Sequence, residues 1–169
     1  MKKKDIPKKE KTQKITILED DLYGDQEIKE ECVQLVVFRL ANEWYGVEIS
    51  RVREVIKVEG LTFLPSSPEY IAGIVNLRGN ILSVTDLKNI FGLARHELTE
   101  QSRLVIVESG ILETGLLVDE VIEIEEVPVT KIDPTLTIIA PEKAEYLEGE
   151  CKIGDKLIGI LKVEKAFMR

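Results

Sequence analysis

The sequence predicts an all-β fold of two five-stranded β-barrel subdomains that share a core, with a short helix after the last strand of each. Short apolar runs alternate with turn residues about every 8 to 12 positions, a spacing typical of β-barrels and sandwiches. Ten such runs are present, which is too many for one small barrel. The second half of the chain also echoes the first, so each half is expected to form one barrel.

The ten predicted strands are apolar segments bounded by glycine, proline, asparagine or charged residues. They cover residues 33–40, 44–49, 52–58, 71–77, 80–85, 103–108, 114–118, 122–127, 147–153 and 157–163. Asp86 is expected to cap a short helix over 87–91, and Gly92 can adopt the left-handed conformation that ends it. A second short helix is expected over 164–168.

The internal echo rests on glycine, proline and aromatic residues, because apolar residues match by chance in β-rich chains. A shift of 76 positions, which carries Pro65 onto Pro141, also carries Tyr70 onto Tyr146. Upstream the shift is 69, which carries Gly46 onto Gly115. Since a unit of about 65 residues is marginally stable alone, the two barrels are expected to share a core and to leave a groove along their seam.

The first residues differ in kind from the rest. Residues 1–14 hold seven lysines against two acidic residues, and residues 15–31 hold seven acidic residues against one lysine. Such charge blocks favour a solvated chain, so 1–31 is predicted to be a charged flexible tail and 32–169 the folded domain. Within that domain we expect subdomain 1 at about 37–98 and subdomain 2 at about 99–169, joined by the first strand, 32–36.

Composition argues against several classes of function. The net charge of −8 disfavours binding to nucleic acid or to anionic membranes. No apolar stretch approaches the roughly 18 to 20 residues of a membrane span, and no secretory signal is visible, so a cytoplasmic protein is expected. His96 is the only histidine, and Cys32 and Cys151 are isolated, which leaves little material for a metal site. No glycine-rich phosphate loop is present either. We therefore expect no cofactor, no metal and no catalytic residue.

One segment carries more information than the rest. Residues 65–87 read PSSPEYIAGIVNLRGNILSVTDL, and physically this is a β-hairpin: 70–77 runs out, Arg78-Gly79-Asn80 turns and 81–84 returns. The segment resembles the signature of the CheW family of chemotaxis coupling proteins. The order and spacing of Trp44-Tyr45-Gly46-Val47 and of Tyr146-Leu147-Glu148-Gly149 agree with it. The resemblance covers about residues 32–168 and implies that both barrels are SH3-like. The sequence departs from the family pattern at Ser83, where proline is common in the family, and at Thr85, where an aliphatic residue is common.

The resemblance also implies a partner-binding site. In the family, the equivalents of Glu54 and Arg78 pair near the receptor-binding surface, and both residues are present here. An exposed ion pair stabilises a fold by only about 0 to 1 kcal/mol, so holding a guanidinium for a partner explains the pair better than stability does. A merely local salt bridge remains the alternative.

Three further positions complete the predicted set of partner-binding residues. Gly73, inside a strand, indicates a bulge or a close approach by another backbone. Ile49 and Val52 are expected to supply apolar area at the seam, unless both are simply core residues. The full set is Ile49, Val52, Glu54, Gly73 and Arg78.

The function that the resemblance implies is that of a non-catalytic adaptor. It would join the cytoplasmic tip of chemoreceptors to the regulatory domain of the histidine kinase CheA, in the cytoplasm at membrane-associated receptor arrays. A CheW-like scaffold of another receptor–kinase pathway, serving surface motility or gene regulation, is the alternative. An enzyme with its active site at the seam would instead require clustered carboxylates with shifted pKa values in a closed pocket.

Overall fold

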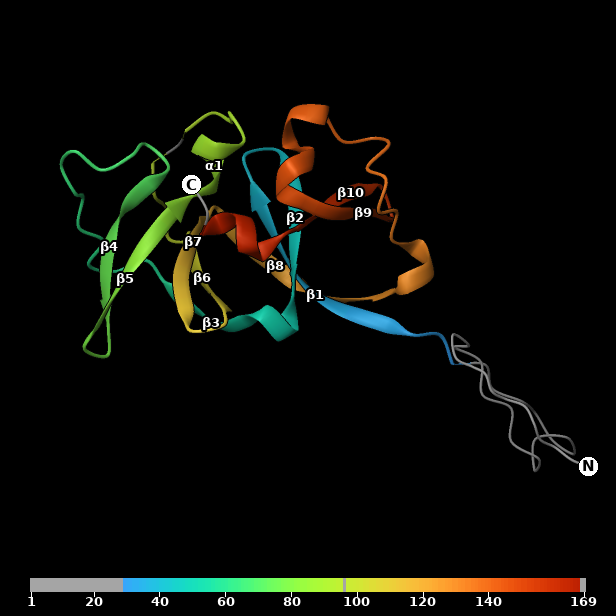
Figure 1. The fold of residues 1–169 in the computed structure, drawn as a ribbon, viewed down its shortest axis with the longest axis horizontal. Helices are drawn as coiled ribbons and strands as arrows, with labels where there is room; N and C mark the ends of the chain where they lie inside the picture. The colour runs from blue at the N-terminus through green and yellow to red at the C-terminus, as the bar shows by residue number, and fades with distance from the viewer. Residues whose placement is uncertain (1–28, 96, 168–169) are drawn as a thin grey trace, which may run out of the picture.

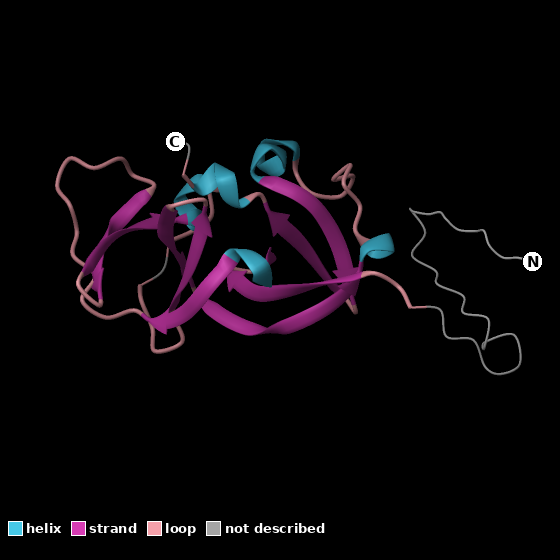
Figure 2. Cartoon of the chain, turned by 60° about the horizontal axis from the view of Figure 1, so that its bottom comes forward, coloured by secondary structure: helices cyan, strands magenta, loops and turns pink. Residues whose placement is uncertain are grey.

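The computed structural model describes residues 29–95 and 97–167 of the 169-residue chain. Most of the predicted tail, His96 and the end of the second predicted helix therefore lie outside the described residues. The all-β prediction is confirmed, because strands dominate the described chain and its helices are short (Figure 2).

All ten predicted strands are present, with ends that differ from the predicted ones by at most two residues. The first half holds β1 Cys32–Leu40, β2 Glu43–Glu48, β3 Val52–Lys57, β4 Ile71–Leu77 and β5 Asn80–Asp86, followed by helix α1 Leu87–Ile90. The second half holds β6 Arg103–Ser109, β7 Leu112–Val118, β8 Glu120–Pro128, β9 Leu147–Ile153 and β10 Lys156–Leu161. The 3₁₀ helices are η3 Ile49–Arg51, η4 Val129–Lys131, η5 Pro141–Tyr146 and η6 Val163–Ala166.

Helix α1 begins where its sequence predicts and ends one residue earlier, at Ile90. The Asp86 carboxylate accepts a hydrogen bond from the backbone N–H of Asn89 at 3.2 Å, and Gly92 has a φ of +69°. The second predicted helix is the 3₁₀ helix η6, which starts one residue earlier, at Val163. Among the described residues, none of the helices has the length and apolar character needed to cross a membrane.

The strands form two five-stranded sheets. Sheet A has the order β8-β1-β2-β10-β9 and sheet B the order β3-β6-β7-β5-β4 (Figure 1). Each sheet thus takes strands from both halves of the chain. The expected boundary near residue 98 therefore does not separate the two sheets. The β1–β2 hairpin joins the strands of the second half, and the β6–β7 hairpin joins those of the first. The two hairpins have thus changed places between the repeats. Because the repeats offer equivalent strand edges, each hairpin still pairs along both of its sides.

The internal echo is reproduced residue by residue in the pairing. In sheet B, β5 runs parallel to β7 with Val84 opposite Gly115; in sheet A, β10 runs parallel to β2 with Ile160 opposite Gly46. These two pairs are equivalent under the shifts of 76 and 69. Isolated bridges between Thr62 and Ile74 and between Asp133 and Glu150 occupy corresponding places in the two sheets, although Thr62 and Asp133 do not match under either shift. Each brings the chain after one edge strand against the opposite edge, which draws that sheet toward a closed barrel.

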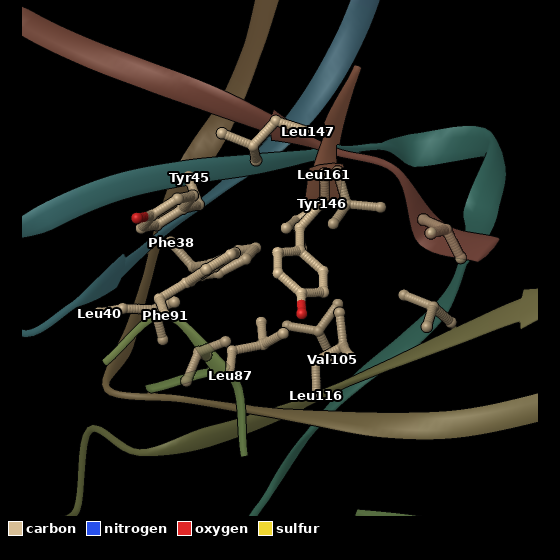
Figure 3. Packing of buried hydrophobic residues seen from close by; sticks show 14 residues of the cluster. Phe38, Leu40, Tyr45, Leu87, Phe91, Val105, Leu116, Tyr146, Leu147 and Leu161 are labelled. Atoms are coloured by element: carbon tan, nitrogen blue, oxygen red, sulfur yellow. The ribbon is translucent and has the colours of Figure 1, made fainter. Parts of the chain in front are cut away.

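The main core lies between the two sheets. Buried side chains from both sheets and from α1 meet there, including Phe38 and Tyr45 of sheet A and Val105 and Leu116 of sheet B (Figure 3). Each sheet also has a smaller cluster of its own. The expected shared core is therefore present. The expected open groove is not found between α1 and η6. The hollow there has a volume of only about 10 Å³, which is room for at most one water molecule.

Candidate partner-binding site

The structure joins Glu54 and Arg78 in one bidentate ion pair. Nη1 and Nη2 of Arg78 donate to the two carboxylate oxygens of Glu54 at 2.7 and 2.8 Å. Glu54 lies on β3 and Arg78 in the turn between β4 and β5. Since β3 and β4 are the two edges of sheet B, the pair links both edges of that sheet. Such a planar fork fixes geometry more sharply than a single charge contact does.

The backbone at Arg78 is unusual for arginine. The turn consists of two residues, Arg78 and Gly79, because Leu77 and Asn80 already pair across the hairpin. Their φ values are +52° and +88°, a combination that favours asparagine and glycine. The Asn76 side chain accepts a hydrogen bond from the backbone N–H of Gly79 at 2.8 Å. An arginine held in the left-handed region costs about 1 to 3 kcal/mol of strain, so local stability does not explain its presence.

The ion pair is exposed on the arginine side. The Arg78 side chain is 66% exposed, whereas that of Glu54 is 23% exposed. The hydrogen bond from Arg78 lowers the pKa of Glu54, and Glu54 in turn raises the pKa of Arg78. Both groups are therefore ionised at neutral pH, and the outer side of the guanidinium faces solvent.

Val52 and Ile49 occupy different environments. Val52 is half-buried and packs against the main core, which favours the core alternative for this residue. Ile49 is 37% exposed and lies in η3, where the chain crosses from sheet A to sheet B. Of the two, Ile49 is the one available to a partner.

Gly73 is buried, and the structure has both a bulge and a close approach by another backbone at this position. The β4–β5 register shifts between Ile71 and Gly73, and the φ of Gly73 is +152°. A Cβ at this position would overlap the carbonyl oxygen of Thr62 and lie 2.9 Å from its carbonyl carbon. Any effect of Gly73 on a partner therefore passes through the backbone that it positions.

The two departures from the family pattern form one hydroxyl cluster with a third residue. Thr114 of β7 donates to the Ser83 carbonyl oxygen at 2.9 Å, and its oxygen lies 3.1 Å from the Ser83 hydroxyl and 3.2 Å from that of Thr85. Because β5 lies between β4 and β7, this strand is interior and not an edge. The hydroxyls therefore satisfy one another within sheet B.

A charged cluster at the crossover between the sheets is not evident from the sequence. Arg51 of η3 pairs with Glu164 of η6 at 2.6 Å. The carboxyl group of Glu148, at the start of β9, lies beside that of Glu48. The pKa of Glu148 is raised, first by burial and then by the hydrogen bond and the negative charge of Glu48 and the negative charge of Glu164. The positive charge of Arg51 opposes this shift. These residues come from three distant segments that only the topology brings together.

The raised pKa of Glu148 predicts how stability depends on pH. A carboxyl whose pKa is higher in the folded than in the unfolded chain binds more protons when folded, so stability falls as pH rises through the interval between the two values. Glu148→Gln removes this loss. The variant should therefore gain stability relative to the wild type as pH rises from below about 4 to neutral. Denaturant titrations of both proteins at several pH values measure the difference, and an advantage that does not change with pH would contradict the assignment.

In the described part of the chain, no three His, Cys, Asp or Glu side chains are grouped so that they could hold a metal ion.

Comparisons with known proteins agree on one family. The model of the CheW-like domain matches residues 34–169. A chemotaxis protein CheW from Helicobacter pylori is 31% identical over 140 residues, which cover 83% of this chain and 84% of that protein. A chemotaxis protein CheW from Klebsiella aerogenes is 27% identical over 132 residues, covering 78% and 80%. The crystal structure of the scaffolding protein TtCheW from Thermoanaerobacter tengcongensis superposes with a TM-score of 0.76 at 38% identity, covering 82% of this chain and 90% of that one.

Proposed function

The chain belongs to the CheW-like domain family and is a chemotaxis coupling adaptor, and we propose that its two partners are the cytoplasmic tip of a chemoreceptor and the regulatory domain of the histidine kinase CheA. The family is one of scaffold proteins. The same proposal includes two further statements. The chain catalyses no reaction, and it works in the cytoplasm at membrane-associated receptor arrays.

The observation that carries the proposal is the exposed ion pair of Glu54 and Arg78. A strained turn holds the arginine, and the glutamate fixes its orientation while leaving most of the side chain accessible. Planar guanidinium groups bind carboxylates and carbonyl oxygens with defined geometry, which suits recognition of a partner. Ile49, at the crossover between the sheets, would add apolar contact area to a receptor helix.

The surface is large enough for both partners. A standard interface covers about 800 Å² on each protein, so two of them would take about a sixth of the accessible surface of 10168 Å². We assign the kinase to exposed apolar side chains in loops of sheet B away from the Arg78 turn, where Ile111 is 98% and Phe63 71% exposed. Burying apolar area of this kind would favour association with the kinase.

The proposal predicts that Arg78→Glu separates binding from folding. The substitution places two carboxylates together and removes the fork, so affinity for a receptor-tip fragment should fall about tenfold or more. The free energy of unfolding should change by no more than about 1 kcal/mol, because the pair is exposed. Binding is measured by titration with a receptor signalling fragment, and stability by denaturant unfolding.

A matched control makes the same charge reversal on the strand that carries Glu54. Lys57→Glu alters an exposed residue of β3 that lies outside the ion pair, and it should leave receptor affinity near the wild-type value. A separate titration with the CheA regulatory domain tests the second partner, and Arg78→Glu should retain kinase binding. Wild-type protein that binds neither partner would overturn the proposal and favour a scaffold of another receptor–kinase pathway.

A further inference from the structure

A bulge in β3 gives two consecutive residues an ion-pair partner each. Val52 lies opposite Val107 of β6 and Glu54 opposite Ile106, so Arg53 is the extra residue of the bulge. Consecutive side chains of a regular strand point to opposite faces, and a bulge re-aims one of them. Here Glu54 pairs with Arg78, while Arg53 reaches past β6 and pairs with Glu113 of β7.

The four charges form an alternating row, which we name the Arg78–Glu54–Arg53–Glu113 row. The two carboxylates are the sheltered members, since their side chains are 23% and 19% exposed against 66% for Arg78 and 50% for Arg53. The Arg53 charge also contributes to the lowered pKa of Glu54. Next to Glu113, Thr114 is hydrogen-bonded to Ser83 of β5, so β7 is held against the strand that follows the Arg78 turn. The row thus connects the Arg78 turn, β3 and β7 through charged side chains.

The other barrel provides an internal comparison, because β8 carries the same bulge, opposite the step from Val37 to Phe38. The four positions equivalent to Arg53, Glu54, Arg78 and Glu113 are there occupied by Ile122, Glu123, Gly154 and Trp44. Ile122 packs against the core of its barrel. Glu123 pairs with Lys156 at 3.8 Å, and Lys156 lies over the Trp44 ring. The fold therefore accepts an apolar residue at the bulge, and among the described residues the row of four charges occurs only in the sheet-B barrel.

We propose that the ion pair of Arg53 and Glu113 positions Glu54, and through it Arg78, for receptor binding. This inference rests on the proposed function. Arg53 is a positioning residue: it does not touch the partner. Its pair with Glu113 fixes the bulge of β3 from which Glu54 extends toward Arg78. Glu113 has the same role one step further from the partner.

The test is a titration of the full chain with a helical-hairpin fragment from the signalling tip of a chemoreceptor. Arg53→Gln and Glu113→Gln should each weaken binding about three- to tenfold, the range expected for coupling within one ion-pair network. Arg53→Lys keeps the charge and should restore most of the affinity. Lys57→Gln removes the same charge from the same strand outside the row and should bind like the wild type. Circular dichroism should show similar melting for all four variants.

The decisive comparison repeats Arg53→Gln in a chain that already carries Arg78→Ala. A residue that acts only through Arg78 has no further effect there. Additive losses would show direct contact with the partner and overturn the positioning role, as would wild-type affinity of Arg53→Gln in the original chain. Failure of the wild-type protein to bind any receptor fragment would instead overturn the proposed function itself.

Discussion

Replacing Gly73 with alanine is expected to lower the free energy of unfolding by about 2 to 5 kcal/mol. Two costs add at this position. Residues that carry a Cβ rarely adopt a φ of +152°, and the new Cβ would overlap the backbone of Thr62. The Thr62 segment cannot move away cheaply, because it exchanges two 2.9 Å backbone hydrogen bonds with Ile74. Denaturant unfolding followed by circular dichroism gives the change in free energy.

Two other glycines separate the two costs. Gly79 has a φ of +88° with open space around its Cβ position, so Gly79→Ala reports backbone strain alone, about 1 to 2 kcal/mol. Gly149 occupies the equivalent of Gly73 in the other barrel, where a Cβ would meet the end of the Ile132 side chain at 2.8 Å. A side chain can yield, so Gly149→Ala should cost less than Gly73→Ala. If Gly73→Ala cost no more than Gly79→Ala, the close approach of the Thr62 backbone would have no energetic weight.

The strands could be predicted from the sequence because each is an apolar run bounded by turn residues. The internal echo also predicted the two equivalent sheets, and the bridges at Thr62 and Asp133 occupy corresponding places in them. Which hairpin belongs to which sheet could not be predicted. Local patterns determine where a strand lies, but two equivalent repeats offer the same edges, and nothing in the strand pattern distinguishes a hairpin's own repeat from the other one.

The candidate site could be predicted only in part. Glu54 and Arg78 came from the family resemblance, since they are distant in sequence and no pattern of spacing joins them. Arg53 was missed because strand alternation places it on the face opposite Glu54, and the bulge that changes this leaves no signal in the sequence. The seam was expected to be an open groove because the internal echo predicts two barrels that meet there. Large aromatic side chains fill it between α1 and η6 instead.

One aromatic ring in that seam connects both halves of the molecule. Phe91 follows α1, stacks on Tyr45 of sheet A at 4.8 Å between ring centroids and meets the edge of Tyr146 at 5.7 Å (Figure 3). Only 7% of Phe91 is exposed. Phe91→Ala should therefore lower the free energy of unfolding by about 3 to 5 kcal/mol, as large cavities in close-packed cores do. Phe63→Ala, at a residue that is 71% exposed, is the matched control and should change stability by less than about 0.5 kcal/mol.

The same variant tests whether the two barrels unfold as one unit. Trp44 is the only tryptophan of the chain and lies in sheet A, so its fluorescence reports that barrel, whereas far-ultraviolet circular dichroism reports all strands. Because the largest core cluster is shared, both signals should give one midpoint in the wild type, and both should shift together in Phe91→Ala. A fluorescence midpoint that stayed in place while the circular dichroism signal split into two steps would show that each barrel is stable alone. The seam would then be an interface between separate domains, and a partner bound to the sheet-B barrel could influence sheet A only by moving one domain against the other.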